Sequence, residues 1–344
     1  MGIRAGLIGF GTVGQAVARR LTGGRDSRVR LVRVCTRAGG RPRPAWLPRS
    51  VGWSDRFDLL LAPDVDVVIE LVGGIEQARR WAHRALLAGK SVVTANKQLV
   101  AEHGPEILSL AARQHCRFRY EGAVAGGVPV IRAVQDGLAG DRLLRVTGIL
   151  NGTCNYILSR MDRGGLSFAD ALAEAKAGGF AEADPAADIE GLDARAKLAI
   201  LCGVGFGVRV RPAEIPCESI ARITPEDLAR ARAAGWTIRQ VSSAEREEGQ
   251  PGRVKASVGP TLVPLDGPLA RAEGCENVVI VAGELGGDTV FAGQGAGGNA
   301  TAVAVISDVL AIAAGLEERG TDRPLLSWLP RPPIASTAHF ERTR

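Results

Sequence analysis

Aromatic residues and lysines are both scarce in this chain. Aromatic side chains make up 4% of its 344 residues, which leaves few platforms on which nucleic-acid bases could stack. Lys and Arg total 43, and nearly all are arginines spread along the sequence. Nucleic-acid-binding proteins usually gather their charge into one patch or tail. We therefore expect no nucleic-acid partner despite the net charge of +6. The five lysines are Lys90, Lys97, Lys176, Lys197 and Lys255.

Long apolar runs and paired cysteines are also missing. No uncharged apolar run reaches the roughly 18 residues that a membrane-spanning helix needs, and the first residues lack the apolar stretch of a signal peptide. The six cysteines lie far apart with no Cys-x-x-Cys pair, which is typical of reduced thiols. These features predict a cytoplasmic protein without a membrane partner.

Alternating strand and helix patterns fill the first 130 residues. Apolar strand-like segments occur at 3–8, 29–35, 65–72 and 91–95, and helical patterns at 13–21 and 76–88. This alternation is typical of an α/β fold with a Rossmann-like, doubly wound parallel sheet.

The pattern changes after Pro129. Strands are expected at 143–150, 254–262 and 277–283, and helices at 167–177, 192–204, 225–234 and 301–314. At the roughly 150 residues typical of a domain, the length fits two domains. We assign 1–130 to a dinucleotide-binding domain, completed by a C-terminal helix at about 300–328. Residues 131–299 form an α+β catalytic and dimerisation domain, and 330–344 a tail.

A glycine motif, Gly9-x-Gly11-x-x-Gly14, lies between the first strand and the first helix. In a dinucleotide-binding turn the first glycine makes the tight bend and the second lets the backbone approach pyrophosphate. The third permits close helix packing, and the helix N-terminus receives the negative charge. The strand–turn–helix setting therefore favours a nucleotide coenzyme over an ordinary glycine-rich turn.

The second strand predicts which coenzyme is bound. An NAD site usually has an acidic residue at this strand's end, but none occurs between Arg28 and Arg49. The guanidinium of Arg37 instead suits a 2′-phosphate, which favours NADP, with NAD possible. We expect solvated loop side chains at Arg41, Arg43 and Arg49.

Two lysines fall in motifs where an amine could do chemistry. Lys97 follows the strand ending at Ala95, on the edge of a parallel sheet where ligands bind. Lys197 follows an acidic stretch and shares a helix face with Asp193, four residues earlier. From the residues alone, three alternatives stay open for that stretch: a surface ion pair, a metal site, or a pocket that binds an ammonium group and holds a proton-transferring lysine.

Cys154 raises a different possibility, a thiol nucleophile as in aldehyde dehydrogenation. Such a cysteine needs a base, usually histidine, and the four histidines carry no site signature. A small buried residue is therefore the favoured interpretation of Cys154.

Six motifs in order resemble homoserine dehydrogenase. They are Gly6–Gly14, Thr94–Lys97 with Gly104, Tyr120–Pro129, Gly148–Leu158, Gly178–Asp193 continuing to Lys197, and Gly295–Gly298 with Thr301 and Asp308. The resemblance covers most of the chain. It implies NAD(P)-dependent interconversion of L-homoserine and L-aspartate 4-semialdehyde, in threonine and methionine biosynthesis. It also implies a homodimer.

The resemblance also implies roles for individual residues. Lys197 matches the proton donor and acceptor, Lys97 the lysine near the reacting oxygen, and Asp193 a group that orients the amine. The remaining expected contacts are Gly152, Thr153, Glu182 and Asp188 for substrate, Gly9, Gly11, Thr12, Val13, Gly14, Arg37, Gly73, Thr94, Lys97 and Gly295 for the coenzyme, and Glu121, Val124, Gly126 and Val128 for a monovalent cation such as Na⁺.

Some positions depart from the family. Phe180 stands where some members have Tyr, Ala187 replaces a carboxylate, and Cys154 replaces a common Thr. The chain also leaves no room for the C-terminal ACT domain of longer members, so threonine feedback through that domain is not expected. Two rival functions remain: a phosphorylating semialdehyde dehydrogenase that uses Cys154, and a non-catalytic NADP-binding protein.

Overall fold

The computed structural model describes residues 2–24, 28–37, 42–250 and 252–317. The expected tail at 330–344 and the end of the helix expected to reach 328 lie outside these residues. The chain divides into two compact units, one comprising 1–127 and the helix that begins at Gly298, the other comprising 128–296. Each unit is described by itself below.

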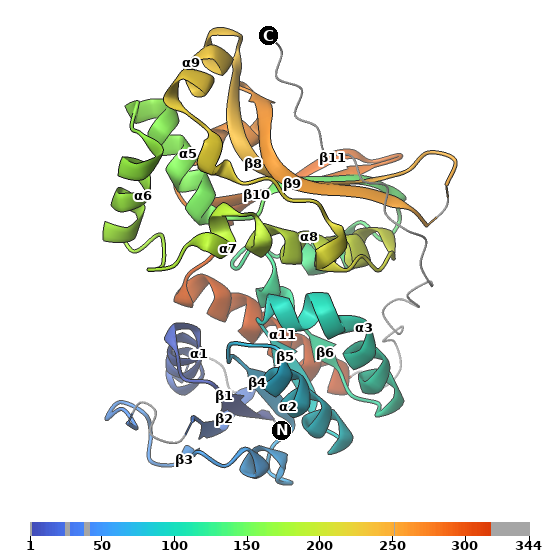
Figure 1. Cartoon of the computed structure of the whole chain (residues 1–344). Coiled ribbons are helices and arrows are strands. Elements are labelled where there is room, and N and C mark those ends of the chain that lie inside the picture. The colour runs from blue at the N-terminus through green and yellow to red at the C-terminus, as the bar shows by residue number, and fades with distance from the viewer. Residues whose placement is uncertain (1, 25–27, 38–41, 251, 318–344) are drawn as a thin grey trace. The chain divides into compact units, whose positions relative to one another are not determined.

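A six-stranded parallel sheet forms the centre of the first unit (Figure 1). Its order β3-β2-β1-β4-β5-β6 runs outward in both directions from β1, which confirms the predicted doubly wound fold. The carboxyl ends of β1, β4 and β5 are in register, because Ile8 pairs with Glu70 and Glu70 pairs with Thr94. The strands are β1 (Ile3–Ile8), β2 (Val29–Cys35), β3 (Gly52–Ser54), β4 (Val67–Glu70), β5 (Ser91–Thr94) and β6 (Phe118–Arg119).

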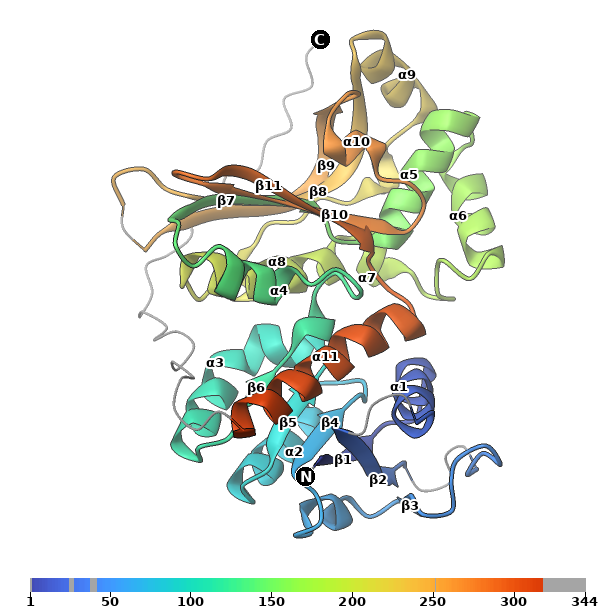
Figure 2. The ribbon, with the colours of Figure 1, turned by 180° about the vertical axis from the view of Figure 1, so that it is seen from behind.

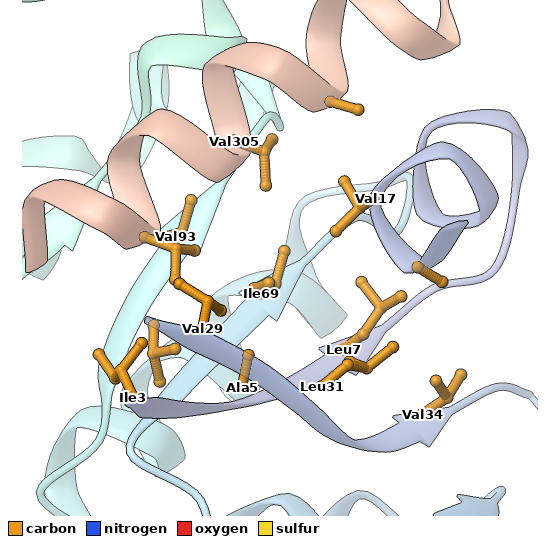
Figure 3. Packing of buried hydrophobic residues seen from close by; sticks show 14 of the residues in the cluster. Ile3, Ala5, Leu7, Val17, Val29, Leu31, Val34, Ile69, Val93 and Val305 are labelled. Carbon is orange, nitrogen blue, oxygen red and sulfur yellow. The ribbon is translucent and has the colours of Figure 1, made fainter. Parts of the chain in front are cut away.

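Helices cover both faces of this sheet. α1 (Thr12–Thr22) and α11 (Gly298–Glu317) pack together on one face (Figure 2), and α2 (Glu76–Leu87) and α3 (Lys97–Arg113) contact β4, β5 and β6. Figure 3 shows Val17 of α1 and Val305 of α11 directed at the apolar side chains of the strands. Burial of this aliphatic cluster is the main stabilising contribution to the unit.

α11 is long and apolar enough to meet the length and composition criteria for a membrane span over Gly298–Gly315. A core helix meets the same criteria, and 44% of that stretch is buried within the structure. Val305, Val309 and Ile312 of α11 belong to the core of the first unit. Its packing therefore accounts for its apolar composition.

The second unit contains a five-stranded antiparallel sheet in the order β11-β10-β7-β8-β9. Its strands are β7 (Leu143–Ile149), β8 (Trp236–Arg246), β9 (Val254–Pro264), β10 (Glu276–Gly283) and β11 (Gly287–Gln294). The sequence patterns predicted β7, β9 and β10 but not β8 or β11. α8 (Leu192–Phe206) contacts β7, β8 and β9, and its apolar side chains are mostly buried.

The remaining helices of the second unit pack beside the sheet. Cys154, Ile157 and Leu158 of α5 enter a core shared with α6, α9 and β8. Ser167 caps α6 by accepting from the amide of Asp170. The helices are α4 (Val130–Arg132), α5 (Gly152–Gly164), α6 (Phe168–Ala177), α7 (Ala186–Ile189), α9 (Pro225–Ala233) and α10 (Pro268–Arg271).

Candidate active site

The turn between β1 and α1 is built for close approach of a ligand to the backbone. Gly9 has φ +94°, a conformation that side chains other than glycine rarely adopt. A Cβ at Gly14 would lie 2.2 Å from the carbonyl oxygen of Gly9, so only glycine lets the helix approach the turn. A Cβ at Gly11 would meet nothing within 4 Å, so the space above this residue is open.

The first turn of α1 can accept an anion. Gly11 caps the helix without a side-chain acceptor, and no acidic residue lies in the first turn. The start of α1, where Gly11 and Thr12 are exposed and Val13 is half-buried, therefore presents amide donors and the positive end of the helix dipole. This arrangement fits the pyrophosphate of a dinucleotide. Gly298, which belongs to the Gly295–Gly298 motif but had no predicted role, lets α11 pack here, because its Cβ would lie 2.9 Å from Thr12 Cγ2.

Two further loops leave the same edge of the sheet. After β4, Gly73 and Gly74 are exposed with open space where a Cβ would lie. Thr94, the last residue of β5, is buried, and Lys97 begins α3 after a two-residue turn. Asn96, which the sequence analysis did not assign, connects the loops by donating from Nδ2 to the carbonyl of Gly74 at 2.7 Å. Gly73, Thr94 and Lys97 thus lie on the edge that carries the glycine turn.

Arginines after β2 lie in different environments. Arg37 is exposed two residues beyond the end of β2, where a ribose 2′-phosphate would be bound in a Rossmann-like fold. The expectation of a solvated side chain is wrong for Arg43, whose guanidinium donates to the carbonyls of Val51 and Pro48. These bonds close the loop 43–51. Arg49 is exposed as expected, and Arg41 lies outside the described residues.

Lys197 lies in a buried polar site of the second unit. Lys197 is 9% exposed, and its Nζ lies 2.7 Å from Asp193 Oδ2 and 2.7 Å from the carbonyl oxygen of Leu150. Helical spacing places Lys197 and Asp193 on one face of α8. The alternative of a solvated surface pair is therefore wrong, because both side chains are buried.

Asn151 joins the two carboxylates of this site, a role that the sequence analysis missed. Its Nδ2 donates to Asp188 Oδ1 at 2.6 Å and to Asp193 Oδ2 at 2.9 Å, while its Oδ1 caps α5 by accepting from the amide of Cys154. The signal that could have found it is an asparagine followed by a glycine and a run with helical spacing, since asparagine is a favoured cap at the residue before a helix. The structure thus brings Asp188, Asp193 and Lys197 together around one amide.

The predicted substrate residues at the start of α5 lie beside this site. A Cβ at Gly152 would lie 2.8 Å from the carbonyl oxygen of Cys275, so the close packing there requires glycine. The hydroxyl of Thr153 donates to the carbonyl of Phe180 at 2.8 Å and ties α5 to the acidic loop. Glu182 is exposed on that loop.

Cys154 is completely buried, and its Sγ donates to the carbonyl of Asp188 at 3.1 Å. Burial raises the pKa of this thiol well above its usual value, and the negative charges of Asp188 and Asp193 raise it further by smaller amounts. A thiolate nucleophile is disfavoured in such a place. The interpretation as a small buried residue therefore agrees with the structure.

The residues expected to bind a monovalent cation lie in and beside a strained turn. Glu121 is 2% exposed, and its amide donates to Asp308 Oδ2 at 2.7 Å. Ala125 and Gly126 both have positive φ, which turns successive carbonyls of this segment in different directions. Val124 is buried in the first unit, whereas Val128 belongs to the second. Within the described residues no group of three or more His, Cys, Asp and Glu could hold a metal.

Gly295 lies in the second unit, where a Cβ would lie 1.6 Å from Asn277 Oδ1. Asn277 is 1% exposed and donates from Nδ2 to the carbonyl of Ile149. Gly295 therefore has a packing role, and its expected coenzyme contact stays a prediction.

Two family profiles and several known proteins match most of the chain. The profile of the homoserine dehydrogenase NAD-binding domain matches residues 9–121, and the homoserine dehydrogenase profile matches 129–310. The homoserine dehydrogenase of Mycobacterium tuberculosis is 43% identical over 343 residues, which covers 97% of this chain and 77% of the relative.

Solved structures agree with these matches. A homoserine dehydrogenase from Thiobacillus denitrificans superposes with a TM-score of 0.89 at 36% identity, covering 97% of this chain and 80% of that one. A hyperthermophilic archaeal homoserine dehydrogenase in complex with NADPH superposes with a TM-score of 0.76 at 25% identity, covering 92% and 98%. With both profiles and these relatives spanning the glycine turn and the buried lysine, the chain belongs to the homoserine dehydrogenase family, NAD(P)-dependent oxidoreductases that act on a CH–OH group.

Proposed function

We propose that the protein interconverts L-homoserine and L-aspartate 4-semialdehyde, with NADP as the preferred coenzyme and Lys197 as the group that exchanges the proton. The observation that carries the proposal is the buried amine of Lys197, held at 2.7 Å by both Asp193 and the carbonyl of Leu150. An amine fixed in one position can reach the substrate hydroxyl in a defined geometry.

The chain's residues would divide the work between binding and proton transfer. Lys197 takes the hydroxyl proton of homoserine or returns it to the aldehyde oxygen, and Asp193 keeps the amine oriented. Asp188, with Gly152, Thr153 and Glu182, binds the polar end of the substrate. For Lys97, in the first unit, we keep the role that the resemblance implies, a contact near the reacting oxygen.

The coenzyme preference rests on two features of the first unit. The glycine turn and the open first turn of α1 fit a pyrophosphate, and exposed Arg37 offers two parallel donors to a 2′-phosphate. The site would be completed by Thr12, Val13, Gly73 and Thr94 of the same unit. When bound, NADP would accept a hydride from C4 of homoserine, and NADPH would supply one in the reverse direction. The NADPH complex of an archaeal relative supports this choice.

We also propose a monovalent cation held by Glu121 and the carbonyls of Val124, Gly126 and Val128. These are hard oxygen ligands, which suit an ion such as Na⁺. The buried carboxylate and the positive φ of Gly126 support the assignment. The cation would order the turn 121–128.

We propose that the enzyme is a cytoplasmic homodimer that pairs through the second unit. Leu262 on β9, Leu285 in the turn after β10 and Val290 on β11 are 44%, 88% and 47% exposed. Exposed apolar side chains on a sheet favour protein–protein contact. The six cysteines are all free thiols, which supports a reducing compartment. Analytical ultracentrifugation would test the dimer, since a monomer at micromolar concentration contradicts it.

The function is tested by following NADPH oxidation with L-aspartate 4-semialdehyde. We expect turnover without phosphate, and a higher kcat/KM with NADPH than with NADH. A substrate lacking the 2-amino group should react much more slowly, because Asp188 and its neighbours would lose the ammonium group. Absence of turnover with either coenzyme would contradict the proposal.

The rival thiol mechanism makes the opposite prediction for one variant. Cys154→Ser keeps a donor toward the carbonyl of Asp188, so we expect turnover within about threefold of the unmodified enzyme. A thiol nucleophile would instead lose nearly all activity and would show phosphate dependence.

A further inference from the structure

A buried carboxyl at the coenzyme-binding edge has no place in the mechanism above. Glu70 ends β4, is 1% exposed and was not singled out by the sequence analysis. Burying a carboxyl is unfavourable unless its oxygens find hydrogen-bond donors. Its location between two loops that carry proposed coenzyme contacts therefore calls for a role.

Both oxygens of Glu70 have donors from different loops. Thr94 Oγ1, at the end of β5, donates to Oε2 at 2.5 Å, and the amide of Val72, after β4, donates to Oε1 at 2.7 Å. The carboxyl thus bridges the backbone that follows β4 and the side chain that ends β5.

Asn96 closes this bridge into a ring. Its amide donates to Thr94 Oγ1 at 2.9 Å, and its Nδ2 donates to the carbonyls of Val72 at 3.3 Å and Gly74 at 2.7 Å. Its Oδ1 accepts from the amide of Leu99 and so caps α3, whose first residue is Lys97. The ring joins the Gly73–Gly74 loop to the turn that presents Lys97.

We propose that Glu70 is a positioning residue that holds the Gly73–Gly74 loop and the Asn96–Lys97 turn in their binding conformation before the coenzyme arrives. The inference rests on the proposed function, because it acts through Lys97. The hydroxyl of Thr94 has one proton, which it gives to Glu70, and it accepts from Asn96. An acceptor at Glu70 therefore sets the direction of the Thr94 hydroxyl, the one group of the ring that could either donate or accept at that position.

Glu70→Gln tests this direction with little change in volume. The amide oxygen can keep the bond from Val72, but the amide nitrogen then faces Thr94, whose proton loses its acceptor. Measurements belong at pH 8, above the pKa of about 7 to which burial raises Glu70 against the hydrogen bonds from Thr94 and Val72. Asp66→Asn is the matched control, because Asp66 precedes the amino end of β4 and pairs with Arg4.

The first measurement is amide hydrogen exchange in the coenzyme-free protein. Glu70→Gln should speed exchange on the order of tenfold in segments 71–75 and 95–99, as expected for the loss of a hydrogen bond to a charged group. Asp66→Asn should leave these segments unchanged. Thr94→Ser should keep slow exchange because it retains the hydroxyl, whereas Thr94→Val should match Glu70→Gln. Unchanged exchange in Glu70→Gln would overturn the inference.

The second measurement is epistasis with Lys97. Glu70→Gln should lower kcat/KM roughly tenfold in the parent enzyme and by a clearly smaller factor in a Lys97→Ala background, because one of the two segments that Glu70 holds then no longer carries its lysine. If the effects of Glu70→Gln and Lys97→Ala on kcat/KM multiply in full, Glu70 acts independently of Lys97, and the inference is overturned. An inactive parent enzyme would contradict the proposed function instead, and hydrogen exchange would still test the ring.

Discussion

Asn151 and Lys197 donate to the same oxygen, Oδ2 of Asp193, at 2.9 Å and 2.7 Å. The side-chain amide of Asn151 also reaches Asp188, so it separates two carboxylates that would otherwise repel each other. Asn151 therefore orients the carboxylate that in turn orients the amine.

Replacing Asn151 with Asp should show this role. The aspartate keeps an acceptor for the amide of Cys154 but replaces the bridging donor with a third negative charge. We expect kcat to fall at least tenfold, which corresponds to roughly 1.4 kcal/mol or more. Ser167→Ala removes another helix cap of the same unit, and it should lower stability by about 1 kcal/mol without changing kcat. Equal kinetics for both variants would contradict the assignment.

Removing the amine of Lys197 should abolish most turnover. General acid–base groups contribute about 10²–10⁴-fold, so Lys197→Ala should lower kcat by that range while NADPH still binds, as measured by fluorescence titration. Lys176→Ala, in the exposed last turn of α6, is the control and should react normally. Near-normal turnover in Lys197→Ala would exclude its role in proton transfer.

Alanine substitutions at two glycines of one motif should impair different properties, stability in one case and coenzyme binding in the other. Gly14→Ala places a methyl group 2.2 Å from the Gly9 carbonyl, so we expect a lower thermal midpoint. Gly11→Ala meets no protein atom within 4 Å, so stability should stay within about 0.5 kcal/mol while NADPH binds more weakly. Thermal unfolding and coenzyme titration of both variants separate the outcomes. Full affinity in Gly11→Ala would show that the coenzyme does not approach this glycine.

Replacing Arg37 should weaken binding of NADP, which carries the 2′-phosphate, and leave binding of NAD unchanged. A charge-assisted hydrogen bond contributes about 1.5–3 kcal/mol, so Arg37→Ala should raise the KM for NADP roughly 10- to 100-fold and leave that for NAD unchanged. Arg49→Ala is the control because Arg49 is exposed in the following loop. An unchanged KM for NADP would remove the basis for the coenzyme preference.

Glu70 should make stability depend on pH in an unusual direction. Burial raises its pKa from 4.5 to about 7, so between these values the folded protein holds a proton that the unfolded chain releases. Its contribution to stability is full below pH 4.5 and is lost as pH rises through 7, by roughly 3 kcal/mol at most. Urea unfolding of the parent and Glu70→Gln proteins should be measured from pH 5 to 8. As pH rises, the free energy of unfolding of the parent should fall relative to that of the variant. A constant difference would contradict the shift.

Short-range features of the fold could be predicted from the sequence. The strand at 3–8, the glycine turn and α1 are consecutive, so their spacing alone specifies them. From Asp288 on, edge strand β11 alternates exposed and half-buried residues, and it includes two glycines and an alanine, which is a weak strand signal. β8 contains Arg239, Gln240 and Ser242, which are buried polar residues that break the apolar pattern of a strand. Arg239 is accommodated because Thr237 and the carbonyls of Ile238 and Ala270 accept from its guanidinium.

The same division holds for the active site. Spacing along the chain is sufficient to pair Asp193 with Lys197, because residues four apart share one face of a helix. The burial of this pair, the bond from the amine to the Leu150 carbonyl and the link through Asn151 to Asp188 all depend on long-range packing. Those contacts span 37 to 47 residues, and they form because α5, α7 and α8 converge when their apolar faces pack together. Such long-range convergence leaves no periodic signal in the sequence.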